Sequence, residues 1–361
     1  MLVHICCSVD SHYFLQKIQE EYPSEKIVGF FYDPNIHPYS EYRLRLLDVQ
    51  YSCDKLGIEL IEGDYDLESW LKIVKGLENE PEKGDRCTVC FDRRVEVSVQ
   101  KAIELGHNKF TTTLLISPKK SQDKLAVIGK SLAAKYNCEF IFKDYRSGNG
   151  VELQGKEVKK NNLYRQNYCG CMYGLNAQRE SQDKLTDELI SPIGQQIQPE
   201  SIEERLELYR KRDQLENCNI IKQRFLNYRL LSGKVVIKKE TVPSYFLCYS
   251  TLRNKKTSGR VEKEIDNINY LNRDEVKIIS IEYFNKISDT NYKNVLELVY
   301  KPLSFNKELE VRQKVIKNSF YDLSLVIVLD TIPDRKMDIF CDSKVFQDIK
   351  ETFDLMKNLG V

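Results

Sequence analysis

The chain has 361 residues and a formal net charge of +1, with 41% hydrophobic and 30% charged residues. This composition is typical of a soluble protein with a sizeable core, and it excludes a strong global positive field, so an RNA-binding surface has to be a local patch. The first residues lack a basic start and no stretch reaches the roughly 18 apolar residues of a membrane helix, so we expect a cytoplasmic protein with no signal peptide and no membrane partner.

Strand and helix patterns alternate through the first part of the chain. Short apolar runs predict buried strands at Leu2–Cys6, Lys26–Tyr32, Ile58–Ile61, Phe110–Ile116 and Glu139–Phe142. Helical patterns lie between them at His12–Glu21, Tyr39–Leu56, Leu67–Leu77, Asp92–Leu105 and Ser121–Lys135. This alternation predicts an α/β fold, a parallel sheet with helices on both faces. Ligands of such sheets bind beyond the carboxyl ends of the strands, where Cys6 and Cys7 follow the first strand.

The second half of the chain has a different pattern. The run Ser147-Gly148-Asn149-Gly150 breaks the alternation, a polar stretch continues to Asn162, and Ser191–Pro199 resembles a linker. A helix is expected from Ser201, with Glu204 completing a capping box. Strand-like runs follow at Val235–Lys238, Tyr245–Tyr249, Val276–Tyr283, Val295–Tyr300 and Leu323–Leu329. We therefore predict a catalytic α/β domain over residues 1–190 and an accessory α+β domain of unknown role over 200–361.

The cysteines are unevenly placed. Six of the 11 form the pairs Cys6-Cys7, Cys87-x-x-Cys90 and Cys169-x-Cys171. The others stand alone and are expected to be small buried hydrophobic side chains: Cys53, Cys138, Cys218, Cys248 and Cys341. A cytoplasmic location disfavours structural disulfides, so the pairs need another explanation.

The three pairs suit a metal centre. A Cys-x-x-Cys at a helix start lets two thiolates converge on one ion, and Gly170 lets the backbone bend so that both neighbouring sulfurs face inward. A tetrahedral zinc or a 4Fe–4S cluster takes four thiolates. Two of the six thiolates remain, for a redox disulfide bond or a second metal. From spacing alone, structural zinc on Cys87, Cys90, Cys169 and Cys171, an iron–sulfur site and a dithiol redox site all stay open.

The first cysteine pair lies in a loop that resembles a known nucleotide-binding loop. The segment Cys6-Cys7-Ser8-Val9-Asp10-Ser11 is similar to the Ser-Gly-Gly-Val-Asp-Ser loop of PP-loop ATP pyrophosphatases, some of which thiolate tRNA. The resemblance implies a sheet of the PP-loop/HUP type. Cys7 and Ser8 replace the glycines that would let backbone N–H groups wrap phosphates. An ATP-dependent, PP-loop-like tRNA sulfur-transferase is therefore the alternative function.

A second resemblance covers about residues 1–175. The chain resembles the QueH family of cobalamin-independent epoxyqueuosine reductases in these segments, in order: His4-Ile5-Cys6-Cys7, Phe30-Phe31-Tyr32-Asp33-Pro34-Asn35-Ile36-His37-Pro38-Tyr39, Cys87-Thr88-Val89-Cys90-Phe91, Thr111-Thr112-Thr113-Leu114, Ile116-Ser117-Pro118 and Tyr164-Arg165-Gln166-Asn167-Tyr168-Cys169-Gly170-Cys171. Asp10 stands where many relatives place a further cysteine, and a carboxylate is a credible iron ligand.

The resemblance implies a reaction and its cofactors. The family removes the epoxide oxygen of epoxyqueuosine at the tRNA wobble position, giving queuosine as the last biosynthetic step. It implies a 4Fe–4S cluster with an adjacent mononuclear iron, the substrate tRNAs for aspartate, asparagine, histidine and tyrosine, and an unidentified electron donor. All six paired cysteines and Asp10 are the implied metal ligands. We assign Cys6, Asp10 and one cysteine of the Cys169/Cys171 pair to the lone iron.

Several polar and aromatic residues near these motifs could have either a functional or a structural role. We predict catalytic roles for Asp10, His37 and Tyr164. Tyr164 and Tyr168 could stack on an anticodon base or pack in the core, and Arg165 could contact a phosphate or the sheet. His4 is expected to be structural, and Asp33 could orient His37 or cap a turn. The lysines could contact phosphates or form a solvated face: Lys119, Lys120, Lys156, Lys159 and Lys160.

A third hypothesis concerns a different class of protein, a non-catalytic RNA-binding protein whose fold is stabilised by zinc. It predicts a colourless protein with near-stoichiometric zinc. The reductase predicts a brown, oxygen-sensitive protein, and the sulfur-transferase predicts hydrolysis of ATP to AMP and pyrophosphate. Colour and metal content therefore separate the three hypotheses.

Overall fold

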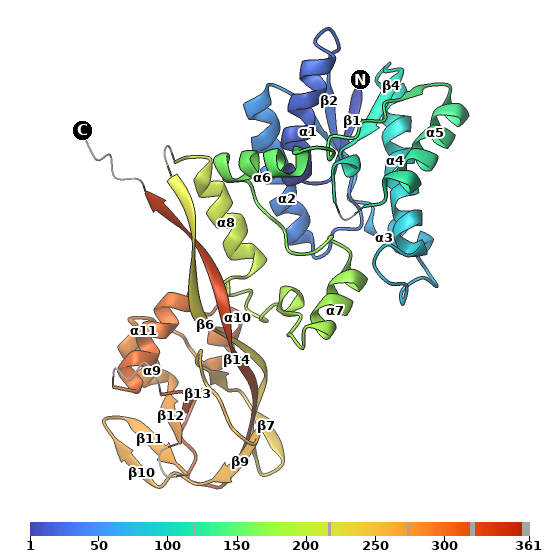
Figure 1. Cartoon of the computed structure of the whole chain (residues 1–361). Coiled ribbons are helices and arrows are strands. Elements are labelled where there is room, and N and C mark those ends of the chain that lie inside the picture. Colours follow the sequence, from blue (N-terminus) through green and yellow to red (C-terminus); the bar gives the residue numbers. More distant parts are fainter. Residues whose placement is uncertain (119, 216–217, 273–274, 318–321, 356–361) are drawn as a thin grey trace, which may run out of the picture. The chain divides into compact units, whose positions relative to one another are not determined.

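The structure is a computed structural model that describes residues 1–118, 120–215, 218–272, 275–317 and 322–355 (Figure 1). It separates into two compact units. The first contains the described residues of Met1–Glu188, Arg205–Ile220 and the stretch from Phe353, and the second contains Leu189–Glu204 and Ile221–Thr352. Lys119 and the side chain of Cys218, both named above, lie outside the described residues.

A five-stranded parallel sheet forms the centre of the first unit. Its strands lie in the order β3-β2-β1-β4-β5, the order of doubly wound α/β sheets. In chain order they are β1 (Leu2–Ile5), β2 (Val28–Phe31), β3 (Glu59–Glu62), β4 (Lys109–Thr112) and β5 (Glu139–Phe140). All four residues of the central strand β1 are buried, as expected for a strand covered on both faces.

Helices flank this sheet in two groups. Helix α1 packs against α2 and α6, whereas α4 packs against α5 and β1 (Figure 1). The helices are α1 (Ser8–Glu21), α2 (Tyr39–Leu56), α3 (Leu67–Ile73), α4 (Asp85–Glu104), α5 (Gln122–Tyr136), α6 (Gly150–Lys160) and α7 (Met172–Ser181). Short 3-10 turns occur at η1 (Thr113–Leu115) and η2 (Asp187–Leu189). The predicted parallel sheet flanked by helices is therefore confirmed.

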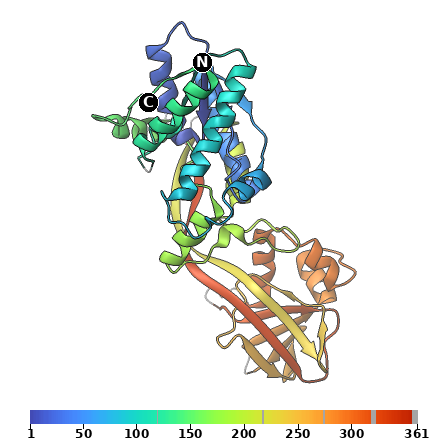
Figure 2. The same cartoon turned by 90° about the vertical axis from the view of Figure 1, so that its right-hand side faces the viewer.

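The second unit contains two sheets. A mixed sheet has the order β10-β11-β12-β13-β8, and a four-stranded sheet has the order β7-β6-β14-β9. The long strands β6 (Cys218–Ile237) and β14 (Met337–Leu355) lie side by side in both views (Figures 1 and 2). The shorter strands are β7 (Glu240–Val242), β8 (Tyr245–Phe246), β9 (Lys256–Gly259), β10 (Lys263–Ile265), β11 (Ile268–Leu271), β12 (Val276–Ser280) and β13 (Leu325–Leu329).

Three helices cover one side of the mixed sheet, consistent with the predicted α+β composition. They are α9 (Ile281–Ser288), α10 (Val295–Tyr300) and α11 (Phe305–Val315). Their apolar residues share a core with the sheet that includes Ile279, Phe284, Val311 and Val328. The predicted helix after Ser201 is α8 (Ile202–Arg212), and the Ser201 hydroxyl accepts a hydrogen bond from the Glu204 N–H at 3.2 Å.

One predicted strand is a helix. Val295–Tyr300 forms α10, because the Asn294 side chain accepts a hydrogen bond from the Glu297 N–H and caps the first turn. Val295 and Leu298 are buried at helical spacing. The predicted strand Val276–Tyr283 divides into β12 and α9, because the Ser280 side chain caps the Tyr283 N–H at 3.1 Å.

The predicted elements of the first unit also differ at their ends. Strand β1 ends at Ile5, before Cys6, and β4 ends at Thr112, whose side chain accepts a hydrogen bond from the Leu114 N–H and starts η1. Helix α4 begins at Asp85, seven residues before its predicted start. The polar stretch before Asn162 forms α6, whose buried residues Gly150, Gln154 and Val158 recur every fourth position.

In the described part of the chain, we find no helix that is long and apolar enough to cross a membrane.

The substitution Phe110→Ala tests how much core packing contributes to the stability of the first unit. The Phe110 ring is fully buried on β4 and contacts Phe140 with ring centroids 5.1 Å apart. We expect Phe110→Ala to lower the free energy of unfolding by about 3–5 kcal/mol, because it removes buried area and leaves a cavity. Urea denaturation followed by circular dichroism measures this. Val127→Ala is the control, since Val127 is 69% exposed and its loss should cost under about 0.5 kcal/mol.

Candidate metal centre

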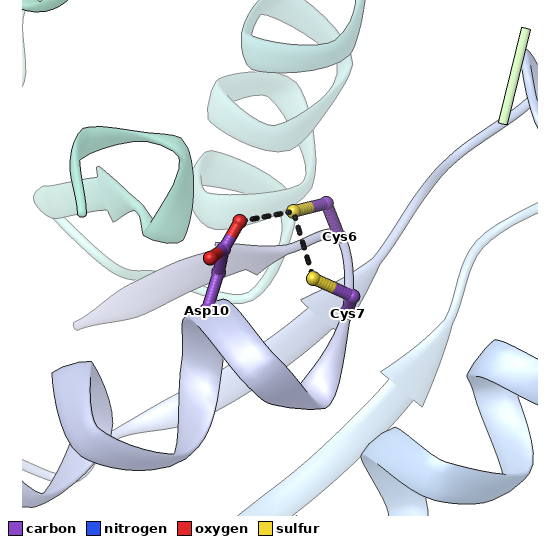
Figure 3. Close-up of side chains that lie close together, drawn as sticks. All are labelled: Cys6, Cys7 and Asp10. Carbon is purple, nitrogen blue, oxygen red and sulfur yellow. Dashed lines mark hydrogen bonds between the residues drawn. The ribbon is translucent and has the colours of Figure 1, made fainter. Parts of the chain in front are cut away.

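Cys6, Cys7 and Asp10 lie together where β1 ends and α1 begins. The Cys6 Sγ lies 3.8 Å from the Cys7 Sγ and 3.8 Å from the Asp10 Oδ2 (Figure 3). Among the described residues, these three form the only group of at least three metal-ligand side chains whose ligand atoms all lie within 4.8 Å of one another. Because the strand ends at Ile5, the chain turns and both thiols reach one place, although neighbours on a regular strand would point apart.

Asp10 is held in position by α6. Its Oδ1 accepts a hydrogen bond from the Gln154 Nε2 at 3.0 Å, and Gln154 also donates to the Val9 carbonyl at 2.9 Å. Burial raises the pKa of Asp10, and the nearby Lys120 ammonium and the Gln154 amide offset part of this rise. The carboxylate therefore has a fixed orientation beside the Cys6 thiol.

The Cys87–Cys90 pair lies in the first two turns of α4, because this helix begins earlier than predicted. Cys90 is buried in a small cluster with Trp70, Val74 and Cys171. Burial raises the pKa of the Cys90 thiol to about 11. Cys87, one turn earlier, is half-buried and accepts a hydrogen bond from the Lys83 N–H at 3.3 Å. The cluster brings the second and third cysteine pairs into contact.

The third pair depends on the conformation of Gly170. Its φ is +115°, which L side chains rarely adopt, and a Cβ there would lie 2.9 Å from the Ile36 Cγ1. The Gly170 carbonyl accepts a hydrogen bond from the His37 N–H at 2.8 Å. Arg45 donates to the carbonyls of Tyr168 at 3.0 Å and Cys169 at 2.9 Å. These contacts fix the backbone on both sides of the Cys169 thiol.

A lysine lies directly against Cys169. The Lys120 Nζ donates a hydrogen bond to the Cys169 Sγ at 3.0 Å. Burial alone would raise the pKa of Cys169, but the positive charges of Lys120, Arg94 and Arg45 together lower it below its usual value. These cations therefore favour the thiolate, the form that binds metal.

Arg94 carries a second buried positive charge beside the cysteines. Burial alone would lower the pKa of its guanidinium, but the Asp33 carboxylate, with which it forms a buried ion pair, raises it. The thiols of Cys90, Cys6 and Cys169 act in the same direction. One residue from each cysteine pair therefore lies within electrostatic range of Arg94.

Some of these groups line a pocket of about 380 Å³ in the first unit. Its size is in the range of small-ligand sites. The lining combines metal-ligand side chains with cationic and amide groups, and it includes Cys6, Asp10, Cys169, Arg45, Arg94, Lys120, Gln154, Arg165 and Gln166. Such a site suits a metal centre next to a polar or anionic substrate.

Two predicted catalytic residues do not line this pocket among the described residues. Tyr164 is buried, and its hydroxyl donates to the Glu41 Oε2 at 3.0 Å. His37 is half-buried, and its Nδ1 has no hydrogen-bond partner in the described part of the chain. The catalytic roles of both residues remain predictions, whereas Asp10 lies in the pocket wall.

The remaining candidates divide between core and surface. His4 is buried and contacts the Thr112 hydroxyl at 2.8 Å, as expected for a structural histidine. Tyr168 is also buried, and its hydroxyl donates to the His37 carbonyl at 2.7 Å. Arg165 is exposed and lines the pocket. Lys156 forms an exposed ion pair with Glu152 at 2.7 Å.

The sequence analysis missed four residues of the centre: Arg45, Arg94, Gln154 and Trp70. Arg45 and Arg94 follow Tyr42 and Phe91 by three positions, so each lies on the apolar face of its helix. A charged residue at such a position, close to a cysteine motif, is a usable signal. The sequence contains no such signal for Gln154, because the residues of α6 were predicted to be a polar stretch without regular structure.

Comparisons with known proteins agree on one family. Residues 1–177 match the family described as "Epoxyqueuosine reductase QueH". The chain is 42% identical to the epoxyqueuosine reductase QueH of Helicobacter pylori, over 96% of this chain and 99% of that protein. It is 34% identical to the QueH of Thermotoga maritima, over 52% of this chain and 95% of that protein.

Among solved structures, the chain is similar to a U34-tRNA thiolase, NcsA from Methanococcus maripaludis with its [4Fe-4S] cluster. The identity is 15%, the TM-score is 0.32, and the match covers 60% of this chain and 73% of that one. A score of this size does not establish a shared fold.

Gly170→Ala tests whether the third pair needs a glycine at its centre. We expect a loss of about 1–3 kcal/mol in the free energy of unfolding, because the positive φ strains any side chain and the Cβ meets Ile36. Denaturant unfolding of the metal-free protein measures it. Gly174→Ala, in α7, is the control, since a Cβ there meets open space. Equal stability of the two variants would remove the conformational requirement.

Proposed function

The chain belongs to the QueH family of epoxyqueuosine reductases, and we propose that it reduces epoxyqueuosine in tRNA with iron held by its paired cysteines and Asp10. The protein is thus an oxidoreductase that acts on tRNA. The observation that supports the cofactor proposal is that Cys6, Asp10 and Cys169 line one pocket together with Arg94 and Lys120. Cys90 and Cys171 share a buried cluster, and Arg94 lies within electrostatic range of Cys6, Cys90 and Cys169.

The residues present fit an iron centre. Six thiols and one carboxylate supply soft and hard donors, and Arg45, Arg94 and Lys120 supply positive charge that offsets an anionic cluster. The indole N–H of Trp70 is buried against Cys90 and Cys171, and its hydrogen bond toward the Cys90 sulfur offsets part of the rise that burial causes in the pKa of that thiol. Cluster sulfur accepts hydrogen bonds of this kind.

The geometry supports a division of the ligands. Cys6, Cys7 and Asp10 are close enough together for a single ion. Four cysteines remain, the number that a 4Fe–4S cluster takes: Cys87, Cys90, Cys169 and Cys171. We therefore propose the cluster on these four and the mononuclear iron at Cys6 and Asp10, with Cys7 in place of the Cys169/Cys171 ligand that we assigned from sequence. All the described cysteines are free thiols, which suits metal ligation rather than a disulfide bond.

Removal of the epoxide oxygen needs two electrons and two protons, and the oxygen leaves as water. An iron–sulfur cluster supplies electrons singly, and a single iron supplies a Lewis acid. Around them, Lys120 and Arg165 place positive charge where negative charge develops on the oxygen as the C–O bond breaks. Gln154 holds the Asp10 carboxylate in place. Gln166, also in the lining, offers an amide to polar groups of the modified base.

Substrate range, partners and location are part of the proposal. We propose the tRNAs for aspartate, asparagine, histidine and tyrosine as substrates, an unidentified electron donor, and a cytoplasmic location. The exposed Arg165 at the pocket is a candidate phosphate contact. For the second unit we propose an accessory role in binding tRNA, and for the parallel sheet the PP-loop/HUP type. The comparisons give no support to the sulfur-transferase alternative.

Iron and sulfide analysis tests the cofactor proposal. We expect anaerobically reconstituted protein to be brown and to hold more iron than inorganic sulfide, because a mononuclear iron adds to a cluster with equal amounts of both. Fully active protein with equal iron and sulfide would exclude the second iron. Near-stoichiometric zinc in active, colourless protein would exclude the cluster.

The variants Cys90→Ser and Cys53→Ser form a matched pair of buried cysteines. We expect Cys90→Ser to lose cluster absorbance and reductase activity together, because a hydroxyl is not a soft donor. Cys53, fully buried in α2, serves as the control and should keep near-normal turnover. Queuosine formation in tRNA and the visible spectrum measure the two effects. Normal activity of Cys90→Ser would make that thiol purely structural.

Asp10→Asn tests the mononuclear site. The change keeps the size of the side chain but removes the charge that balances a metal ion, so we expect activity to fall about a hundredfold or more. The cluster absorbance should remain, since its thiolates are untouched, and Asp10→Cys should restore part of the activity. Iron content, spectrum and queuosine formation are measured with and without ATP. Normal turnover of the Asn variant would rule out a ligand role, and strict ATP dependence would favour the sulfur-transferase.

A further inference from the structure

Arg212 lies outside the part of the chain that the family model matches, yet it is connected to the candidate metal centre through Asp48. The match ends at residue 177, whereas Arg212 is the last residue of α8. Arg212 is buried and belongs to the same compact unit as the cysteine pairs. The guanidinium lies 3.6 Å from the centroid of the Tyr51 ring, so it is held firmly in a plane.

The partner of Arg212 is Asp48, on α2. The Arg212 Nη1 donates to the Asp48 carboxylate and also to the Asn162 carbonyl at 3.0 Å. Both side chains of this ion pair are 1% exposed. Burial raises the pKa of Asp48, and Arg212 offsets part of this rise. Removing Arg212 would leave the buried Asp48 carboxyl group without its cation, which is strongly destabilising.

Asp48 in turn contacts two segments that carry candidate ligands. Its Oδ2 accepts hydrogen bonds from the Ser8 hydroxyl and from the Tyr164 N–H, the latter at 2.9 Å. Ser8 is the first residue of α1 and follows Cys7, the N-cap residue. Cys7 makes no side-chain capping hydrogen bond of its own. The Ser8–Asp48 contact therefore holds the residue next to Cys7, while Gln154 holds Val9 and Asp10 further along the same turn.

We propose that Arg212 is a positioning residue for the cysteine centre, acting through Asp48 and Ser8 on the first turn of α1 and thus on the Cys7 thiol. The Tyr164 contact extends this action to the segment that leads to Cys169. An element outside the family-matched region thereby completes the support of the centre. This role goes beyond the reductase activity, and it concerns the thiols whether or not a metal is bound.

The experiment measures how often Cys7 becomes accessible. Metal-free, reduced protein is treated with iodoacetamide, and mass spectrometry gives the alkylation rate at each cysteine. Because Cys7 is 2% exposed, its alkylation requires local opening of the start of α1. Cys53 is fully buried in α2 of the same unit, so the ratio of the Cys7 rate to the Cys53 rate cancels general unfolding.

We expect Arg212→Ala to raise this ratio about tenfold or more, because it leaves the Asp48 carboxylate buried without a cation. Arg212→Lys, which keeps the charge but loses the planar guanidinium, should restore part of the wild-type ratio. Arg179→Ala is the matched control, since it removes another buried ion pair of the same unit, with Glu188, and should leave the ratio unchanged.

Two outcomes would overturn the proposal. One is equal acceleration of Cys7 and Cys53 in Arg212→Ala, and the other is an equal rise of the ratio in Arg179→Ala. If Arg212→Ala does not fold, Ser8→Ala decides, since it removes one hydroxyl and leaves the ion pair. Ser8→Ala should raise the ratio by a smaller factor, and an unchanged ratio would contradict the relay through Ser8.

Discussion

A stripe of polar side chains on the buried face of α2 holds together the segments that form the candidate metal centre. Glu41, Arg45, Asp48 and Ser52 recur at helical spacing and are all buried. Together they bind the Tyr164 hydroxyl, the Cys169 carbonyl, the Ser8 hydroxyl and the His12 ring. Buried polar groups are stable only when fully paired, so this stripe fixes each segment it contacts in one place.

Pairing of opposite charges also stabilises the other side of the pocket. Thiolates that converge in a low-dielectric interior repel one another unless cations lie among them. Arg94, paired with Asp33, and Lys120, against Cys169, provide those cations from α4 and from the loop before α5. The centre is thus built from oppositely charged groups on several elements, none of which would be stable in the interior alone.

The sequence was sufficient for the parts of this design that repeat locally. Alternating strands and helices predicted the parallel sheet, and the placement of Cys6 and Cys7 at the end of the first strand pointed to the edge where these two side chains and Asp10 lie together. It was insufficient where a pattern has two physical meanings. In sequence, the polar stripe on α2 looks like the solvent-facing side of a helix, although it is buried. Val295–Tyr300 has the apolar composition of a strand, but Asn294 caps it and it forms a helix. Only tertiary contacts decide such cases.

The conformation of Gly170 bears on how this protein can change over evolutionary time. Every single-nucleotide substitution in a glycine codon that yields a different amino acid introduces a side chain, and at a φ of +115° any such side chain meets Ile36 and Arg45. Gly170 therefore cannot be replaced by a single amino-acid substitution without backbone strain and a steric clash. Thr88 and Val89, between the other pair, are half-buried in an ordinary helix and face no such barrier. Of the two spacers, the shorter one should diverge far more slowly between lineages.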